Sequence, residues 1–340
     1  MSIEESRILV HRHIRDSLCL LGNRGLNVKQ LRYLAIRVLQ MIPVLLVVTI
    51  IIFWGIRMIP GNPAVNILGE KASEEAIHAM EIRMGLDKPV WEQYLIYMKQ
   101  LLHFDLGTSL RLKESVSTLI FQRSGVTILY TVLCTFFTMI IGIPMGYIAG
   151  TTPKKSVQKT ITSTALVILS LPEFWFGILL LLLFGLKLGI VPIGGWGETP
   201  AEHIYCMLLP AFTGAIGSVG LLIRNIQSAV EKLLSKDYVN FARSKGTAAG
   251  IIRNHYVMKN VMVSTMTLIA MRITSLLGGS VVIESVYALP GLGKMLVDAI
   301  NGRDYVLVQG TVLVYAVVVM MITLLTDLIY CFIDPRISMD

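Results

Sequence analysis

The stretch Asp237-Tyr-Val-Asn-Phe-Ala-Arg-Ser-Lys-Gly246 lies at the centre of a polar segment between two long apolar runs. The whole segment, residues 224–259, carries seven Lys or Arg against two acids. Charged side chains are costly in hydrocarbon, so a basic segment of this length belongs in water at one face of a membrane. The sequence therefore predicts membrane helices on both sides of it and a surface offered to something in the cytoplasm.

The composition is that of an integral membrane protein. Hydrophobic residues make up 54% of the 340 residues and charged residues only 15%, whereas soluble domains carry about 25% charge. The net charge of +8 does not indicate nucleic-acid binding, because the basic residues flank apolar runs instead of forming one patch. The four cysteines are scattered and form no CxxC, so neither a disulfide framework nor a metal site is expected.

Long apolar stretches with at most one charge in their interior predict six transmembrane helices, since about 20 apolar residues are needed to cross the hydrocarbon core. We expect them near 36–58, 124–150, 160–186, 205–224, 260–283 and 307–332. With the N-terminus inside, the inner segments hold 18 Lys or Arg and the outer segments 10. The positive-inside rule therefore predicts that both termini are cytoplasmic.

This topology divides the chain into a cytoplasmic tail (1–35), a first helix (36–58), an extracytoplasmic helical segment (59–123), a five-helix core (124–333) and a second cytoplasmic tail (334–340). The core contains a long cytoplasmic loop, 225–259. Within the extracytoplasmic segment, Ser73 is expected to cap one helix that ends before Gly85, and Pro89 to open another.

Small residues in the second span predict close helix packing. Gly142, Gly146 and Gly150 recur every four residues, and small residues let helix backbones approach closely in lipid.

Three charges fall inside the predicted spans: Glu173, Arg272 and Asp327. Intramembrane charges are candidates for a functional role because they are costly there. A purely structural alternative is that Arg272 pairs with Asp327 and holds two helices together.

The chain shows no catalytic constellation. A Walker A loop needs GxxxxGK followed by Ser or Thr. Here Met295 follows Gly293-Lys294, and Ala288 holds the place of the first glycine. Neither HExxH nor GxSxG occurs. We expect no catalytic residue and no cofactor in this chain, so any energy for transport must come from a partner subunit or an ion gradient.

Several motifs resemble those of a known family. Residues 237–260 resemble the cytoplasmic EAA loop of ABC-importer permeases, with Ala242 and Gly246 at the bend and a second helix from Ile251. Further stretches resemble the dipeptide/oligopeptide/nickel permeases, specifically the first of their two permeases: residues 57–64, 171–177, 189–195, 282–300, 303–305, and the ending 327–336.

The resemblance implies a type I ABC-importer permease in a bacterial inner membrane. A second homologous permease would share the pathway, two cytoplasmic ATPases would bind ATP and Mg, and an extracytoplasmic protein would deliver substrate. The implied coupling residues are Asp237 as a helix cap, Tyr238, Ala242 as a small contact face, Arg243, Lys245, Gly246 as the turn, Ile251 and Arg253. The implied outer pathway loop contains Glu284, Pro290, Gly291, Gly293 and Asp298. The cations of the loop would pair with acids of an ATPase or, alternatively, face anionic lipid.

The substrate stays open within this resemblance. Short peptides are implied first, with nickel, metal-chelate complexes or glutathione as alternatives. A different class, the stand-alone secondary transporter or channel, is not excluded by six spans, but such proteins often contain inverted repeats and we find none here. A membrane enzyme is disfavoured by the missing catalytic motifs.

Overall fold

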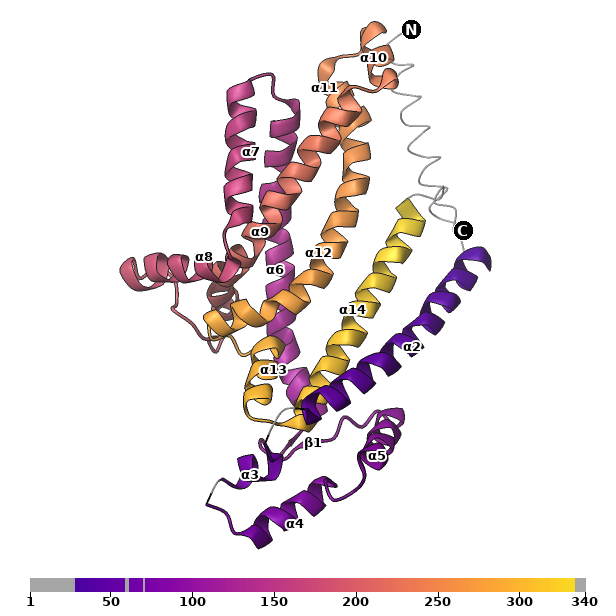
Figure 1. The fold of residues 1–340 in the computed structure, drawn as a ribbon. Helices are drawn as coiled ribbons and strands as arrows, with labels where there is room; N and C mark the ends of the chain where they lie inside the picture. Colours follow the sequence, from indigo (N-terminus) through magenta and orange to yellow (C-terminus); the bar gives the residue numbers. More distant parts are fainter. Residues whose placement is uncertain (1–27, 59–60, 70, 334–340) are drawn as a thin grey trace.

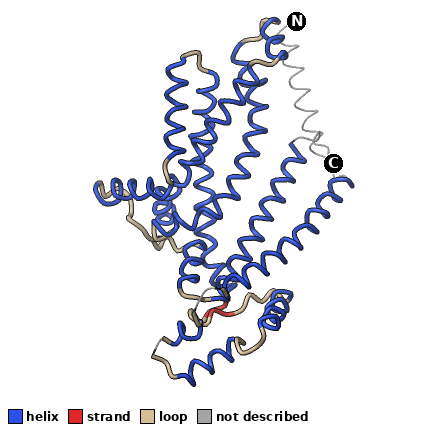
Figure 2. Tube along the Cα trace, in the orientation of Figure 1, coloured by secondary structure: helices blue, strands red, loops and turns tan. Residues whose placement is uncertain are grey.

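The computed structural model describes residues 28–58, 61–69 and 71–333, and these are almost entirely helical (Figures 1 and 2). The helices that build the membrane bundle are α2 (Val28–Arg57), α6 (Val116–Thr151), α7 (Lys155–Ser170), α8 (Glu173–Leu180) with its π-helical continuation η1 (Leu181–Lys187), α9 (Pro200–Leu234), α12 (Lys259–Val286) and α14 (Tyr305–Ile333). Two groups of short elements lie at opposite ends of this bundle in Figure 1. One group is α10 (Asp237–Ser244), α11 (Ala249–Ile251) and η2 (Ile252–Met258); the other is α3 (Pro63–Leu68), α4 (Glu74–Met84), α5 (Val90–Leu102), strands β1 (Thr108–Ser109) and β2 (Glu114–Ser115), and α13 (Leu292–Asn301).

The described helices agree with the predicted number of spans. Four of them, α2, α6, α9 and α14, are long and apolar enough to cross a membrane, and two bent pairs raise the number to six. The first bent pair is α7 with α8 and η1; the second runs from Ala249 through η2 into α12 and bends between Leu276 and Ser280.

The third predicted span, 160–186, is wrong as a single straight helix. α7 ends at Ser170, and the chain turns by 100° into α8. Pro172 explains the break, because it has no N–H to continue the helix and pushes Leu171 into an extended conformation. The 16 residues of α7 rise about 24 Å, less than the roughly 30 Å hydrocarbon core. α12 is bent by 56° between Leu276 and Ser280.

Two other predicted boundaries are too narrow. α6 begins at Val116 instead of 124, and α9 extends from Pro200 to Leu234 instead of 205–224. Charge patterns mark where a helix leaves hydrocarbon, whereas caps and helix propensity decide where it ends. At the start of α9, Thr199 and Glu202 form a capping box. The predicted loop 225–259 therefore begins with ten residues of α9.

The predicted close packing along α6 is confirmed. The three glycines face α9, and a Cβ added to any of them would lie within 2.7–2.8 Å of an α9 side chain. The pairs are Gly142 with Leu222, Gly146 with Ile226, and Gly150 with Val230. The bare glycine backbone lets α6 and α9 pack closely, and this contact is the centre of the bundle (Figure 1).

The elements of the predicted extracytoplasmic segment follow the predicted caps. The Ser73 hydroxyl accepts from the Ala76 N–H at the start of α4, and Gly85 ends that helix with φ +68°. α5 begins immediately after Pro89. The fold class needs one addition, because strands β1 and β2 pair antiparallel in a hairpin, with Thr108 opposite Ser115.

This group of elements is fastened to the membrane helices. The Arg57 guanidinium at the end of α2 donates to the Gln93 side chain of α5 at 2.8 and 3.2 Å. Tyr94 packs edge-on against Phe53 of α2. The hairpin is fixed by a hydrogen bond from Ser109 to the carboxylate of Asp304, just before α14.

Candidate functional site

The predicted coupling segment is a short helix held against the bundle by a small apolar face. Val239 and Ala242 of α10 are buried, and they contact a cluster formed by α9, η2 and α12. The cluster contains Leu222, Ile226, Val230, Ile252, Val257 and Val261. Ala242 was predicted to keep an outward docking face small, and this is wrong: its methyl group points inward, where it lets α10 lie close to the bundle.

The turn predicted at Gly246 is present. Its φ is +77°, in the left-handed region that favours glycine. The N–H of Thr247 bonds to the carbonyl of Ala242 at 3.1 Å, and that of Gly246 to Arg243 at 2.9 Å. This pair of bonds is a Schellman motif, which ends α10 and turns the chain toward α11.

Asp237 does not cap α10 as predicted. The helix begins at Asp237 itself, its N-cap is Lys236, and no side chain makes a capping hydrogen bond. The carboxylate in the first turn still lies at the positive end of the helix dipole.

The exposed side of this segment combines aromatic, aliphatic and cationic side chains. Tyr238, Phe241 and Ile251 are exposed, Phe241 by 62%. The predicted cations are also exposed, and the Lys245 ammonium lies 4.5 Å from the centre of the Phe241 ring. The other two predicted cations, Arg243 and Arg253, form no ion pair in the described part of the chain. Phe241 was missed as a site residue, although its spacing of three from Tyr238 places both on one helix face.

The second helix of the segment is mechanically joined to the spans. α11 continues through η2 directly into α12. The Tyr147 hydroxyl of α6 donates to the Asn254 side chain of η2 at 2.7 Å. A displacement of α10 and α11 therefore acts on α12 and α6 together.

The residues of the predicted outer pathway loop come together around one buried carboxylate. Glu284, at the end of α12, has no exposed surface. It accepts from the Thr127 hydroxyl of α6 at 2.7 Å and from the Lys294 N–H at 2.9 Å. The same Thr127 oxygen accepts from the Leu292 N–H at 2.9 Å. Glu284 and Thr127 thus satisfy two N–H groups in the first turn of α13.

Two glycines make room for this carboxylate. A Cβ on Gly291 would lie 2.4 Å from the Glu284 side chain, and one on Gly293 would lie 3.0 Å from it and 2.6 Å from Val281. The neighbouring Pro290 accepts through its carbonyl from Arg123 at 3.4 Å. Asp298 pairs instead with Lys294 at 3.3 Å, one turn along α13.

A cavity of about 560 Å³ lies beside this loop. Its polar lining carries both signs of charge, and its residues come from the β hairpin, the start of α6, α13 and the turn before α14. The charged ones are Arg111, Arg123, Lys294, Asp298 and Asp304.

The two intramembrane charges with described side chains do not form an ion pair with each other. Arg272 is at the middle of α12, and its Nε is buried without a hydrogen-bond partner among the described residues. The Glu173 carboxyl lies against Gly217 of α9, where a Cβ would be 2.6 Å away, and it interacts electrostatically with Arg272. The predicted alternative partner, Asp327, lies on α14 with its side chain outside the described residues.

Two sequence profiles cover this arrangement of helices. Residues 142–339 match the binding-protein-dependent transport system inner membrane component, and residues 30–131 match the N-terminal part of such membrane components. The chain belongs to the family of inner-membrane components of binding-protein-dependent transport systems. It is therefore a multi-pass transport permease of a bacterial inner membrane, as the resemblance implied.

Individual members of this permease family match nearly end to end. A putative peptide transport system permease protein of Brucella abortus (strain 2308) is 37% identical, over 89% of this chain and 98% of its own length. The oligopeptide transport system permease protein AppB of Bacillus subtilis (strain 168) is 32% identical, over 90% and 99%. The dipeptide transport system permease protein DppB of Escherichia coli (strain K12) is 30% identical, over 90% and 98%.

A solved structure supports the fold of the permease. The inward-facing MetNI methionine ABC transporter matches with a TM-score of 0.54, over 64% of this chain and 96% of the other. At 16% identity this similarity concerns the fold alone. The predicted type I ABC-importer permease fold is confirmed.

Proposed function

We propose that this permease imports short peptides, and that α10 and α11 receive the movement that drives import from a cytoplasmic ATPase. The observation that carries the proposal is the α10–Gly246–α11 segment. It projects from the bundle with Tyr238, Phe241 and Ile251 exposed, it continues directly into α12, and its second helix is hydrogen-bonded to α6 through η2. Exposed aromatic and aliphatic side chains among cations are suited to a groove on a protein partner.

The rest of the assembly follows from this proposal. A second homologous permease completes the pathway, two ATPase subunits bind ATP and Mg, and a binding protein delivers substrate to the segment 59–115. Both termini then lie in the cytoplasm with α10 and α11. The peptide class is supported by the names of the relatives; nickel, a metal chelate or glutathione are the alternative substrates for the same architecture.

Transport by purified components tests the proposal. This chain is expressed with its neighbouring transport genes, purified through a tag on this chain, and reconstituted in liposomes containing ATP. We expect two ATPase subunits and a second permease to co-purify, and a labelled tripeptide to enter only with ATP and the binding protein. Uptake by this chain alone without ATP would instead identify a stand-alone transporter. Uptake of Ni²⁺ but not of tripeptide would reject the peptide class.

A further inference from the structure

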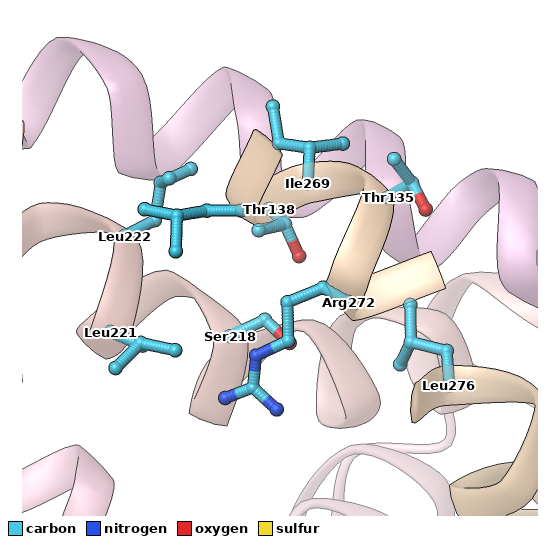
Figure 3. Close-up of a pocket in the computed structure, with 9 residues that line it drawn as sticks. Thr135, Thr138, Ser218, Leu221, Leu222, Ile269, Arg272 and Leu276 are labelled. Atoms are coloured by element: carbon cyan, nitrogen blue, oxygen red, sulfur yellow. The ribbon is translucent and has the colours of Figure 1, made fainter. Parts of the chain in front are cut away.

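A small, mostly apolar pocket between α6, α9 and α12 has four polar or charged side chains in its lining (Figure 3). Figure 3 shows the Arg272 side chain reaching from α12 past Ser218 of α9. The void itself is small, about 10 Å³, and Thr135 and Thr138 of α6 also line it. Since Arg272 is at the centre of the 28 residues of α12, it lies about 20 Å from either end of that helix. The pocket is therefore deep within the membrane bundle.

Two polar groups in this pocket lack partners among the described residues. The Ser218 hydroxyl is buried, with only 2% of the residue exposed, and makes no hydrogen bond. The Arg272 Nε is likewise buried and unsatisfied. Leaving such buried groups unpaired is destabilising, and more so for a charged group. The Arg272 Nε and the Ser218 hydroxyl line the same pocket and have no hydrogen-bond partner among the described residues, so both are available as donors to an acceptor from outside the chain.

A carboxylate from α8 lies against α9 next to Ser218. Glu173, the first residue of α8, rests against Gly217, the neighbour of Ser218. It interacts electrostatically with Arg272, yet no ion pair joins the two among the described side chains. The break at Pro172 holds this carboxylate in place at the start of α8. Glu173 on α8 and Arg272 on α12 are opposite charges on two helices that both pack against α9, and they match a ligand that carries both charges itself.

We propose that Arg272, Ser218 and Glu173 form a substrate site in the membrane part of the pathway, which takes a zwitterionic peptide. The Arg272 guanidinium and the Ser218 hydroxyl bind the C-terminal carboxylate, and Glu173 binds the ammonium group. The planar guanidinium offers two parallel donors to a carboxylate, which a lysine does not. This inference rests on the proposed function, because it requires that peptides pass through this permease.

The test compares two peptides in two forms of the complete importer. Initial uptake rates of tri-alanine and of its C-terminal carboxamide are measured with the wild type and with Arg272→Gln, normalised to the amount of this chain in the membrane. The binding protein is the same in all four measurements. Its own preference between the two peptides therefore cancels when each rate in the variant is divided by the wild-type rate for the same peptide. We expect Arg272→Gln to lower tri-alanine uptake at least tenfold and carboxamide uptake less than twofold.

Control variants separate binding from structure. Lys187→Gln removes an exposed cation at the end of η1 and is expected to leave the ratio of the two rates unchanged. Arg272→Lys keeps the charge and should retain part of the preference for the carboxylate. Glu173→Gln is expected to lower uptake of tri-alanine but not of its N-acetylated form.

Three results would overturn the inference. If Arg272→Gln lowered the uptake rates of both peptides equally, the arginine would not be the group that binds the C-terminal carboxylate. Restoration of both rates by adding Asp327→Asn would show that Arg272 serves an internal ion pair. No wild-type uptake of either peptide would reject the peptide function itself, and with it this site.

Discussion

Replacing Gly146 by Ala tests whether the close contact between α6 and α9 holds the bundle together. The new Cβ would lie 2.8 Å from the Cβ of Ile226 and 3.0 Å from the carbonyl oxygen of Ile223. Non-bonded carbon atoms prefer about 3.5–4.0 Å. Because the Ile223 oxygen belongs to the backbone, side-chain rotation cannot relieve this contact. The two helices must separate locally by about 1 Å.

The magnitude follows from two opposing effects. Overpacking a close interface costs about 1–3 kcal/mol. Alanine is a better helix former than glycine by about 1 kcal/mol, which offsets part of that cost. Gly125 supplies the matched control, because it lies on the same helix and a Cβ there meets nothing within 4 Å. We expect Gly146→Ala to be less stable than Gly125→Ala by about 1–3 kcal/mol, the steric cost alone.

The assay is an SDS titration of the purified chain in mixed micelles, from which the free energy of unfolding is obtained by circular dichroism. Thiol labelling of the buried Cys134 gives a second measure of opening, since its residue is 0% exposed in the folded bundle. Equal unfolding free energies for Gly146→Ala and Gly125→Ala would refute the argument that this contact limits the distance between α6 and α9.

Three further variants test the other sites. Gly246→Leu forces a branched side chain into φ +77°, which costs about 1 kcal/mol or more. We expect normal membrane levels but at least tenfold lower uptake, whereas Gly125→Ala, in open space with ordinary φ and outside the coupling segment, should transport normally. Glu284→Gln keeps the shape of the side chain but loses charge-assisted bonds to Thr127 and to α13. Thermal unfolding in detergent should therefore show a loss of about 1.5–3 kcal/mol; an unchanged midpoint would show that these bonds do not stabilise the contact between α12, α6 and α13. Phe241→Ala removes an exposed ring and should reduce co-purification of the ATPase without lowering the level of this chain; intact co-purification would place docking elsewhere.

Much of this fold could be predicted because its signals are local. The caps at Ser73 and Gly85 depend on side chains and backbone angles within one turn, and both are present. The turn at Gly246 is likewise a local signal, because it depends on the backbone angle of one residue. The glycine repeat of α6 predicted a close contact correctly, although it could not name α9 as the partner.

The candidate sites were predicted less completely. Ala242 was placed on the wrong side of α10, because one buried and one exposed face cannot be told apart in a helix of eight residues. Glu284, Gly291 and Gly293 do lie together, but their role in an outer pathway stays a prediction. The buried Glu284 is held by a hydrogen bond from Thr127, more than 150 residues away. No pattern along the chain contains that contact.

The sequence by itself determined which segments can enter hydrocarbon, where short helices begin, and which family the chain belongs to. Each of these properties depends on residues that are close together in the chain. They can therefore be predicted without knowing which distant residues those segments contact. The tertiary structure decided the 100° bend after α7, the inward face of Ala242 and the burial of Glu284. It also decided that the Arg272 Nε is buried without a hydrogen-bond partner among the described residues. Each depends on which distant helix lies opposite, because burial and hydrogen bonding are properties of contacts and not of the chain alone.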